Sequence, residues 1–335
     1  MCRRSRAIPT WAVDNVPKID DILNAVEDID AEALVIQHQD GLLSWDQLGR
    51  LALDDRLVGK VTVVVLHNAG NMARASSHEL MTLLEGLGKF SRVLVHNIAD
   101  MNFLLSMGLK HNIGLLPHGA FAPDQAPWPK RFTQHDAPII GCHGFFFQHK
   151  GIDKLIRAAA ILRQDWPNLK LRLVNAQFPG EGHQAYISEC KALAKSLGVY
   201  DAIEWHQAFM PIEEVNGLLS ACDIIALPYS ESTDSASGAV RVSLASMVPL
   251  VATRVKIFAE LGDAAAWADN NDPEVLAEVI GRLLRSPEER RTVQAAMHDW
   301  LHAHDWSRVA GTMEGMIQGL VQEKRLHWDV NRMAS

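Results

Sequence analysis

A turn of small residues follows one of the apolar runs of this 335-residue chain. The run spans residues 224–227, and residues 234–241 read Asp-Ser-Ala-Ser-Gly-Ala-Val-Arg before a helix-like segment. A strand, an open turn and a helix N-terminus direct several N–H groups at one point, where the helix dipole favours an anion. This pattern predicts a phosphate site. Ser, Asp and Gly also form ordinary turns, so a simple helix cap is the alternative.

A second segment also points to an anion. A predicted strand at residues 139–142 leads into Gly144, three phenylalanines, Gln148, His149, Lys150 and Gly151. A predicted helix over residues 150–163 would place Lys150 at its start. An ammonium group there could neutralise a diphosphate as it leaves. The alternative is an ordinary solvated lysine. The 234–241 turn and Lys150 both point to an anion site. This agreement makes a chance pattern less plausible than it is for either feature alone.

The elements that must position these residues alternate between short apolar runs and longer amphipathic stretches. This is the pattern of an α/β protein whose parallel strands are covered by helices on both faces. The predicted strands are residues 33–37, 61–66, 93–95, 113–116, 139–142, 169–174, 203–205, 224–227 and 250–252. The predicted helices are residues 150–163, 184–196, 212–221, 239–246 and 273–284, followed by a helical tail after residue 287 with a break at 305–307.

A histidine follows each of the first four predicted strands. They are His38, His67, His96 and His118. Ligands of doubly wound sheets bind at the carboxyl ends of the strands, so these side chains are candidates for a binding site. A structural histidine, bonded to a neighbouring loop, is the alternative for each, and we expect it to hold for most of the four.

Length and composition indicate two folded domains. A chain of 335 residues exceeds the usual size of one hydrophobic core. Four prolines, Pro123, Pro127, Pro129 and Pro138, predict a linker. We therefore expect an N-terminal domain at residues 1–132, a C-terminal domain at 133–305 and a helical tail at 306–335 that packs on the first domain. The net charge is −8 and the cations are scattered, which argues against nucleic-acid binding.

Several other classes of protein are disfavoured. The four cysteines show no metal-binding spacing and are typical of reduced, buried thiols in a cytoplasmic protein. His298, His302 and His304 have no third ligand nearby, so an exposed polar face is favoured and no metal site is predicted. There is no secretory signal and no apolar run of membrane-spanning length. GxGxxG, GxxxxGK[ST] and GxSxG motifs are absent, which disfavours dehydrogenases, common NTPases and α/β-hydrolases.

Taken in order, several segments resemble the retaining glycosyltransferases of family 4, which have the GT-B fold. The closest subgroup carries an acidic-Ser-x-Ser-Gly-Ala-Val-Arg turn. The resemblance covers nearly all of residues 138–305 and is looser in the first half, at residues 65–68 and 116–119. The matching stretches are residues 144–156, 166–171, 221–224 with Pro228, 237–241 and 249–253.

The resemblance implies two Rossmann-like doubly wound domains that face a cleft. It implies transfer of a sugar from a UDP- or GDP-linked donor to a glycan or lipid-linked acceptor, with retained configuration and without a metal or other cofactor. Surface polysaccharide or glycan assembly would be the setting. The protein would be cytoplasmic, with peripheral attachment to the inner membrane face as a further option.

The family's roles transfer to matching positions of this chain. Lys150 would bind the diphosphate, and the amides of Ser237, Gly238 and Ala239 would hold phosphate and sugar oxygens. Asp234 and His67 would contact the donor sugar, which makes them, with Lys150, the expected catalytic residues. Further donor-binding positions are Gly144, Ser235, Arg241 and His118.

Three departures from the family pattern stand out. Val242 replaces the carboxylate that holds the ribose, and Phe145 replaces an arginine whose charge Arg241 could supply. The first clear strand begins only at Ala33, so the N-terminal domain is expected to be incomplete. A bare sheet edge favours association with another chain, identical or not. A non-catalytic subunit that keeps the donor pocket is therefore an alternative, and a nucleotide-sugar epimerase is a third.

Overall fold

The computed structural model describes residues 19–39, 42–121, 137–179, 183–231 and 235–334. The chain divides into two compact units. The first comprises residues 1–118, 233–236 and 307–335, and the second comprises residues 119–232 and 237–306. Several predictions lie outside the described residues: Cys2, the boundary at residue 132, Pro123, Pro127, Pro129 and Asp234.

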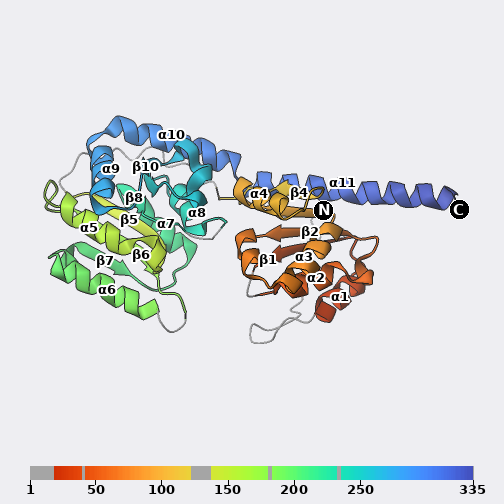
Figure 1. Cartoon of the computed structure of the whole chain (residues 1–335). Coiled ribbons are helices and arrows are strands. Elements are labelled where there is room, and N and C mark those ends of the chain that lie inside the picture. Colours follow the sequence, from red (N-terminus) through yellow and green to blue (C-terminus); the bar gives the residue numbers. More distant parts are fainter. Residues whose placement is uncertain (1–18, 40–41, 122–136, 180–182, 232–234, 335) are drawn as a thin grey trace. The chain divides into compact units, whose positions relative to one another are not determined.

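The first unit alternates strands and helices (Figure 1). In chain order its elements are α1 (Ile19–Asp28), β1 (Ala33–His38), α2 (Trp45–Ala52), β2 (Val61–Leu66), α3 (Ser77–Lys89), β3 (Arg92–Val95), α4 (Ile98–Ser106), β4 (Ile113–Leu115) and most of α11 (Trp306–Ala334). Within the described residues the four strands form a parallel sheet in the order β1-β2-β3-β4. Their carboxyl ends therefore lie at one edge.

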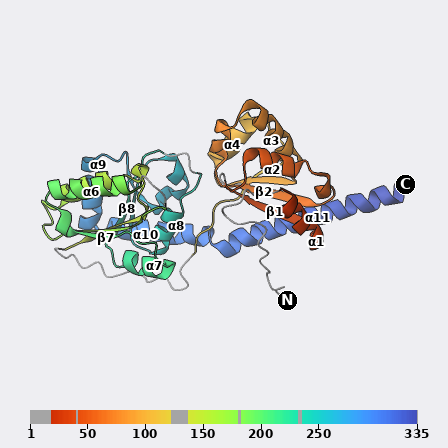
Figure 2. The same cartoon turned by 90° about the horizontal axis from the view of Figure 1, so that it is seen from below.

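Both faces of this first sheet are covered. Val64, Leu66, Val93 and Val95 share a hydrophobic core with residues of α1, α2 and α3. The side chains that alternate with them, such as Val63, are also buried. Helix α11 lies on the side opposite α2 and α3 (Figure 2). Strands buried on two sides read as continuous apolar runs, which is why the sequence reveals them.

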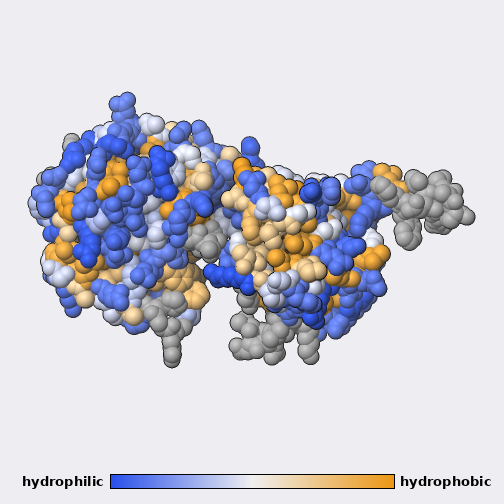
Figure 3. All heavy atoms as spheres, in the orientation of Figure 1, coloured by the Kyte–Doolittle hydropathy of each residue, from blue (hydrophilic) through white to orange (hydrophobic). Residues whose placement is uncertain are grey.

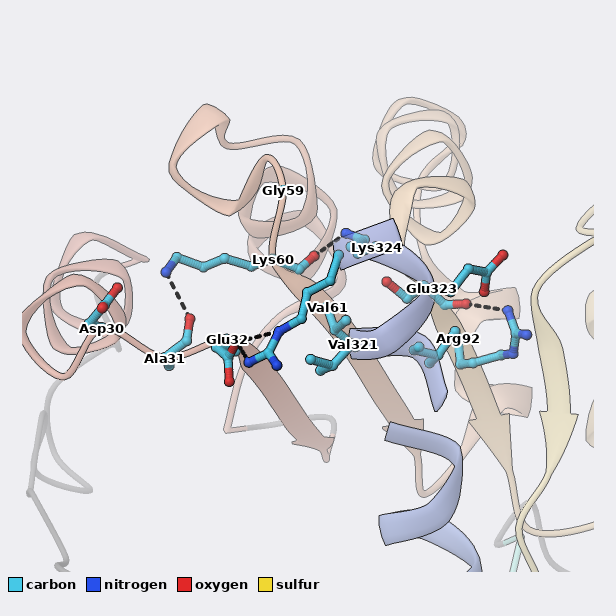
Figure 4. Close-up of a pocket in the computed structure, with 13 residues that line it drawn as sticks. Asp30, Ala31, Glu32, Gly59, Lys60, Val61, Arg92, Val321, Glu323 and Lys324 are labelled. Atoms are coloured by element: carbon cyan, nitrogen blue, oxygen red, sulfur yellow. Dashed lines mark hydrogen bonds and ion pairs between the residues drawn. The ribbon is translucent and has the colours of Figure 1, made fainter. Parts of the chain in front are cut away.

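Polar contacts hold α11 at the amino-terminal ends of the strands. Arg325 forms an ion pair with Glu32, and Lys324 donates a hydrogen bond to the carbonyl of Lys60 (Figure 4). Lys60 Nζ in turn lies 2.8 Å from the Ala31 oxygen. A cavity of about 820 Å³ lies among these residues. It occupies the edge opposite the strand ends where ligands of such sheets bind, so we assign it to helix packing.

The second unit is larger. Its elements are β5 (Ile139–Phe145), α5 (Ile152–Leu162), β6 (Lys170–Ala176), α6 (His183–Ser196), β7 (Ile203–His206), α7 (Ile212–Ser220), β8 (Ile224–Leu227), α8 (Gly238–Ala245), β9 (Leu250–Thr253), β10 (Ala266–Ala268), α9 (Pro273–Arg285) and α10 (Pro287–Ala303). Helices α6 and α9 lie on one side of the sheet, and α7 and α10 lie on the other (Figure 2).

The strand order of the second sheet locates a binding site. Among the described residues it is a parallel sheet in the order β10-β9-β8-β5-β6-β7. The chain winds outwards from β5 to β7, returns to the other side of β5, and continues outwards from β8. The order therefore reverses between β5 and β8, and in open α/β sheets ligands bind beyond the carboxyl ends of the strands at such a point.

The elements that were predicted by residue range occur in the structure, but the helices α1, α2, α3 and α4 had no predicted range, and two further differences appear. All nine predicted strands exist, but β10 was not predicted because Ala-Trp-Ala is short and contains two small residues. The predicted helix from residue 150 is wrong at its start. Residues Gln148–Lys150 form a 3-10 turn, Gly151 is left-handed, and α5 begins at Ile152. Cys142, Cys190 and Cys222 are buried thiols outside any disulfide, as predicted.

None of the helices that the structure describes combines the length and apolar composition needed to cross a bilayer.

Candidate functional site

The loops that follow β5 and β8 are tied together at the point where the strand order reverses. Ser230 N donates to the His149 carbonyl at 2.8 Å. Gly151 adopts φ 65° and ψ 29°, and a Cβ there would lie 2.0 Å from the Pro228 oxygen. Only glycine tolerates both the left-handed backbone and this close approach. Lys150 is thereby held beside the Pro228–Tyr229 corner.

The Lys150 side chain is buried against an aromatic ring. It is only 8% exposed, and Nζ lies 3.9 Å from the centroid of the Tyr229 ring. Tyr229 is itself 1% exposed and packs on Phe258 at 4.7 Å between centroids. A cation over an aromatic face is stabilised by the ring quadrupole, and more so when water is excluded. Lys150 is thus a positioned charge, unlike an ordinary solvated lysine.

Helix α8 begins close to the end of β5. The Ser237 hydroxyl caps the helix by accepting from Val240 N at 3.4 Å. No hydrogen bond from the amides of Gly238 or Ala239 occurs among the described residues. Both N–H groups lie at the positive end of the helix dipole, a position that suits an anion. This geometry is compatible with the phosphate interpretation and also contains the helix cap offered as its alternative.

A small space lies next to Gly144, between the ring of Tyr229 and the start of α8. Its φ is 137°, a conformation that L side chains rarely adopt. A Cβ at this position would lie 3.5 Å from Ala239 Cβ, 3.6 Å from Tyr229 Oη and 4.0 Å from Asn175 Nδ2. The predicted donor residues Gly144 and Ala239 thus border one space, together with the ring beneath Lys150. Asn175 was not predicted, although an Asn that ends the apolar run of β6 is a recognisable signal.

Arg241 lies in the first turns of α8 and is 4% exposed. Its guanidinium donates to the Ser237 carbonyl at 2.9 Å and to Glu260 Oε1 at 2.5 Å. Burial lowers the pKa of Arg241, and the Glu260 carboxylate acts in the opposite direction. These contacts connect Arg241 to the residue that caps α8, so the side chain can act on the anion site by holding Ser237 in place.

We expect Arg241→Ala to weaken donor binding and to lower stability by about 2–3 kcal/mol, because it leaves the partly buried Glu260 unpaired. The measurements are the dissociation constant of UDP or GDP and the free energy of unfolding. Glu260→Gln is the matched variant, since it keeps Arg241 and its bond to Ser237. Unchanged donor affinity in Arg241→Ala would contradict a role for this arginine in the site.

Three of the four predicted histidines gather at the carboxyl edge of the first sheet. The ring centroids of His67 and His96 are 4.7 Å apart, and those of His96 and His118 are 5.3 Å apart. His38 differs because its Nε2 bonds to the Leu43 carbonyl at 2.9 Å and its ring packs against that of Trp45 at a tilt of 34°. His38 therefore has the structural role that we expected for most of the four.

Hydrogen bonds define which atoms of the cluster carry protons. His96 Nδ1 lies 2.9 Å from the Leu116 carbonyl, which only accepts, so this nitrogen is protonated. In its neutral form His96 would accept at Nε2, where His67 Nδ1 approaches to 3.2 Å. Burial lowers the pKa of His67, which favours its neutral form. With both rings neutral, His67 donates through Nδ1 and keeps a lone pair on Nε2, and this is the protonation pattern that we expect.

The Nε2 atom of His67 faces the side chain of Gln37, with 2.8 Å to Oε1. The tautomer with its proton on Nδ1 requires the Gln37 amide to turn over and present its NH₂ group to Nε2, an exchange between groups of nearly equal size. A substrate hydroxyl could take the same place, since an O–H donates to the lone pair. His67 in this state suits a sugar hydroxyl better than a phosphate oxygen, which only accepts.

We expect His96→Phe to change the protonation pattern of His67, because it removes the acceptor that holds the proton on Nδ1. The measurement is ¹⁵N–¹H correlation NMR of the imidazole rings near pH 7, in which wild-type His67 should show a protonated Nδ1 and an unprotonated Nε2. His78→Ala, at an exposed position of α3, is the control. Protonated Nε2 in the wild type would refute the assignment.

Two further predicted positions belong to the segment before α8. Ser235 is buried and groups with the first unit, where Asn97 Nδ2 donates to its carbonyl at 2.8 Å. The Asn97 side-chain oxygen also caps α4 by accepting from Asp100 N. Asp234 lies outside the described residues, so its expected contact with the donor sugar stays a prediction.

Comparison with known proteins identifies the domain type of the second unit. Residues 137–286 match the family described as glycosyl transferases group 1. A D-inositol 3-phosphate glycosyltransferase of Corynebacterium urealyticum is 24% identical over 224 residues, which cover 63% of this chain and 52% of the relative. A GDP-mannose-dependent alpha-(1-6)-phosphatidylinositol monomannoside mannosyltransferase of Mycolicibacterium smegmatis is 26% identical over 256 residues, 71% of this chain and 65% of the relative. This chain therefore spans between half and two thirds of their length.

Solved structures confirm the fold. Anabaena HepE, crystallised with UDP, superposes with a TM-score of 0.74 at 15% identity, covering 90% of this chain and 82% of HepE. The sucrose-phosphate synthase of Thermosynechococcus elongatus gives a TM-score of 0.69 at 18% identity, covering 91% and 77%. The chain has the predicted GT-B-type α/β architecture of two Rossmann-like units, each built on a parallel sheet.

Proposed function

We propose that this chain is a glycosyltransferase that moves a sugar from a nucleoside diphosphate sugar to an acceptor with retention of configuration. The observation that carries the proposal is the buried Lys150, placed over the Tyr229 ring where the strand order reverses. This site lies within the segment that matches glycosyl transferases group 1. A fixed cation and open helix amides suit a diphosphate.

The proposed chemistry is mainly electrostatic. The bond between the anomeric carbon and the diphosphate oxygen breaks, and its electron pair moves to the phosphate. The acceptor oxygen bonds to the carbon on the same face and passes its proton to the leaving diphosphate. Lys150 and the amides of Ser237, Gly238 and Ala239 would stabilise the charge that develops on the leaving group, which lowers the barrier without a nucleophile from the protein.

The remaining residues would orient the sugar. Asp234 is proposed to lie near the reacting carbon, and His67 to accept a hydrogen bond from a sugar hydroxyl through Nε2. Gly144, Ser235, Arg241 and His118 complete the proposed donor-binding set. We propose no metal and no other cofactor, because the leaving charge would be met by Lys150 and the helix amides.

The names of related proteins guide the choice of donor and acceptor. One relative is described as GDP-mannose-dependent, and HepE was crystallised with UDP, so both bases are candidates here. One relative is named for D-inositol 3-phosphate, and the GDP-mannose-dependent one is named for phosphatidylinositol monomannoside. These names support a glycan or lipid-linked acceptor and a role in surface glycan assembly as proposals for this chain.

Thermal-shift screening with UDP, GDP and their sugars tests the proposal. The buffer contains EDTA, so that binding does not depend on a divalent metal. The best donor is then incubated with candidate acceptors, and the anomeric configuration of the product is read by NMR. We expect a rise in melting temperature with at least one nucleotide and a product with retained configuration. An absence of any shift would contradict the proposal.

A non-catalytic nucleotide-sugar-binding subunit is the second candidate. Two departures favour it: Phe145 stands where the family has an arginine, and Val242 stands where it has a ribose-binding carboxylate. Such a subunit would support a partner transferase. Donor binding without hydrolysis or transfer would favour this function over the enzyme.

Association with another chain is also proposed. Strand β4 is at the edge of the first sheet within the described residues, and its Leu115 is 43% exposed. Met81 and Ile98, on α3 and α4, are 74% and 60% exposed, and apolar side chains are visible on this unit in Figure 3. An open sheet edge and exposed apolar side chains each favour a partner. A strictly monomeric species in analytical ultracentrifugation would count against it.

The proposed location is the cytoplasm, with peripheral attachment at the inner membrane face, which fractionation of cells would test.

A further inference from the structure

Asn175 is a buried polar residue that the proposed chemistry leaves unused. It ends the apolar part of β6 and is 0% exposed. Neither its Nδ2 nor its Oδ1 has a nitrogen or oxygen hydrogen-bond partner among the residues that the structure describes. The amide interacts with the buried thiol of Cys142 and acts to lower the pKa of that thiol, but a thiol is a weak hydrogen-bonding group and satisfies an amide poorly. Buried amides without partners are rare in folded proteins and call for an explanation.

The position of Asn175 supplies that explanation. In the register of the sheet, Asn175 is the direct partner of Gly144 on β5. Because Gly144 has no side chain, a space of methyl size remains, bordered by Asn175 Nδ2, Tyr229 Oη and Ala239 Cβ. An oxygen atom of a ligand has a similar size. The amide therefore faces the same small space as the second residue of α8 and the ring beneath Lys150.

We propose that Asn175 is a donor-binding residue whose Nδ2 donates a hydrogen bond to a pyrophosphate oxygen of the nucleoside diphosphate sugar. This inference rests on the proposed function and names a residue for the same site. Lys150 and the start of α8 both favour a negatively charged ligand, and a phosphate oxygen only accepts hydrogen bonds. The neutral amide of Asn175 would add a further hydrogen-bond donor for this oxygen without adding charge to the site.

Asn175→Leu is the main test, because leucine has nearly the shape of asparagine and no polar atoms. Removal of an unpaired buried amide should leave the melting temperature of the ligand-free protein unchanged or raise it. The affinity for UDP, GDP and inorganic pyrophosphate should fall about tenfold or more. The measurements are melting curves and isothermal titration calorimetry on the full chain with EDTA.

Asn112→Leu is the matched control. Asn112 is also buried, but its Nδ2 donates to the carbonyls of Leu87 and Phe90, each at 2.7 Å. The same substitution there should lower the melting temperature and leave nucleotide affinity intact. If Asn175→Leu behaves like Asn112→Leu in both respects, Asn175 is a structural residue or bonds a buried water, and the proposal is overturned.

A measurement on the wild type covers the case in which Asn175→Leu fails to fold. The side-chain NH₂ signals of asparagines are recorded by ¹⁵N NMR, and Asn175→Ser identifies those of Asn175. Saturation with UDP or GDP should shift these signals, and unshifted signals despite binding would overturn the inference alone. If neither nucleotide nor pyrophosphate binds the wild type, the proposed function fails as well.

Discussion

Lys150→Ala is expected to reduce sugar transfer by about 10²–10³-fold, equivalent to about 3–4 kcal/mol of transition-state stabilisation. The Lys150 ammonium is held 3.9 Å from the Tyr229 ring in a site with little water, where a charge acts more strongly on a leaving diphosphate than it would in solution. Alanine leaves the helix amides in place but removes this charge. The measurement is turnover of the donor that gives the largest thermal shift.

The affinity for the nucleotide product should fall together with the rate. Lys154→Ala is the control, because its side chain is 41% exposed on the same helix-turn region and should leave turnover within twofold, about the effect of an exposed charge. Lys150→Arg should recover only part of the activity, since the larger guanidinium must enter a buried space. Wild-type turnover in Lys150→Ala would remove the central element of the proposed mechanism.

The sequence revealed most of the fold because the strands are buried on both sides. Continuous apolar runs such as 61–66 and 224–227 match β2 and β8 residue for residue. Strand β10 lacked this signal because its Ala-Trp-Ala sequence is too short and too weakly apolar. The order of strands, and hence the reversal between β5 and β8, depends on contacts distant in sequence that no local pattern encodes.

The candidate site was predicted in part, and the limits have physical causes. Lys150 and the turn before α8 follow neighbouring strands, as expected from two anion-directed segments. The sequence could not show that Lys150 is buried, because its burial depends on Tyr229, 79 positions later. Likewise, His38 and His67 each follow an apolar run in the sequence, and only the fold distinguishes the structural histidine from the one in the histidine cluster.

Gly151→Ala is expected to destabilise the second unit by more than about 4 kcal/mol, the largest stability effect that we predict for a single substitution. The left-handed backbone alone disfavours alanine by about 1–2 kcal/mol. A Cβ would also lie 2.0 Å from the Pro228 oxygen and 3.1 Å from its carbonyl carbon, so backbone on both sides must move. Ser230 N and the His149 carbonyl hold these two loops together and resist that movement.

Melting curves test this expectation, and the shift should be a fall of about 8–16 °C for a unit of this size. Gly217→Ala is the matched control. This glycine is exposed inside α7, and a Cβ added there would have open space around it, so the substitution should raise stability by about 0.5–1 kcal/mol. Because Gly151 directly follows Lys150, any Gly151→Ala protein that still folds should also bind nucleotide more weakly.

A Gly151→Ala protein with the wild-type melting temperature would show that the loops after β5 and β8 are not rigidly joined. The electrostatic role of Lys150 depends on this rigid support, so that result would count against it.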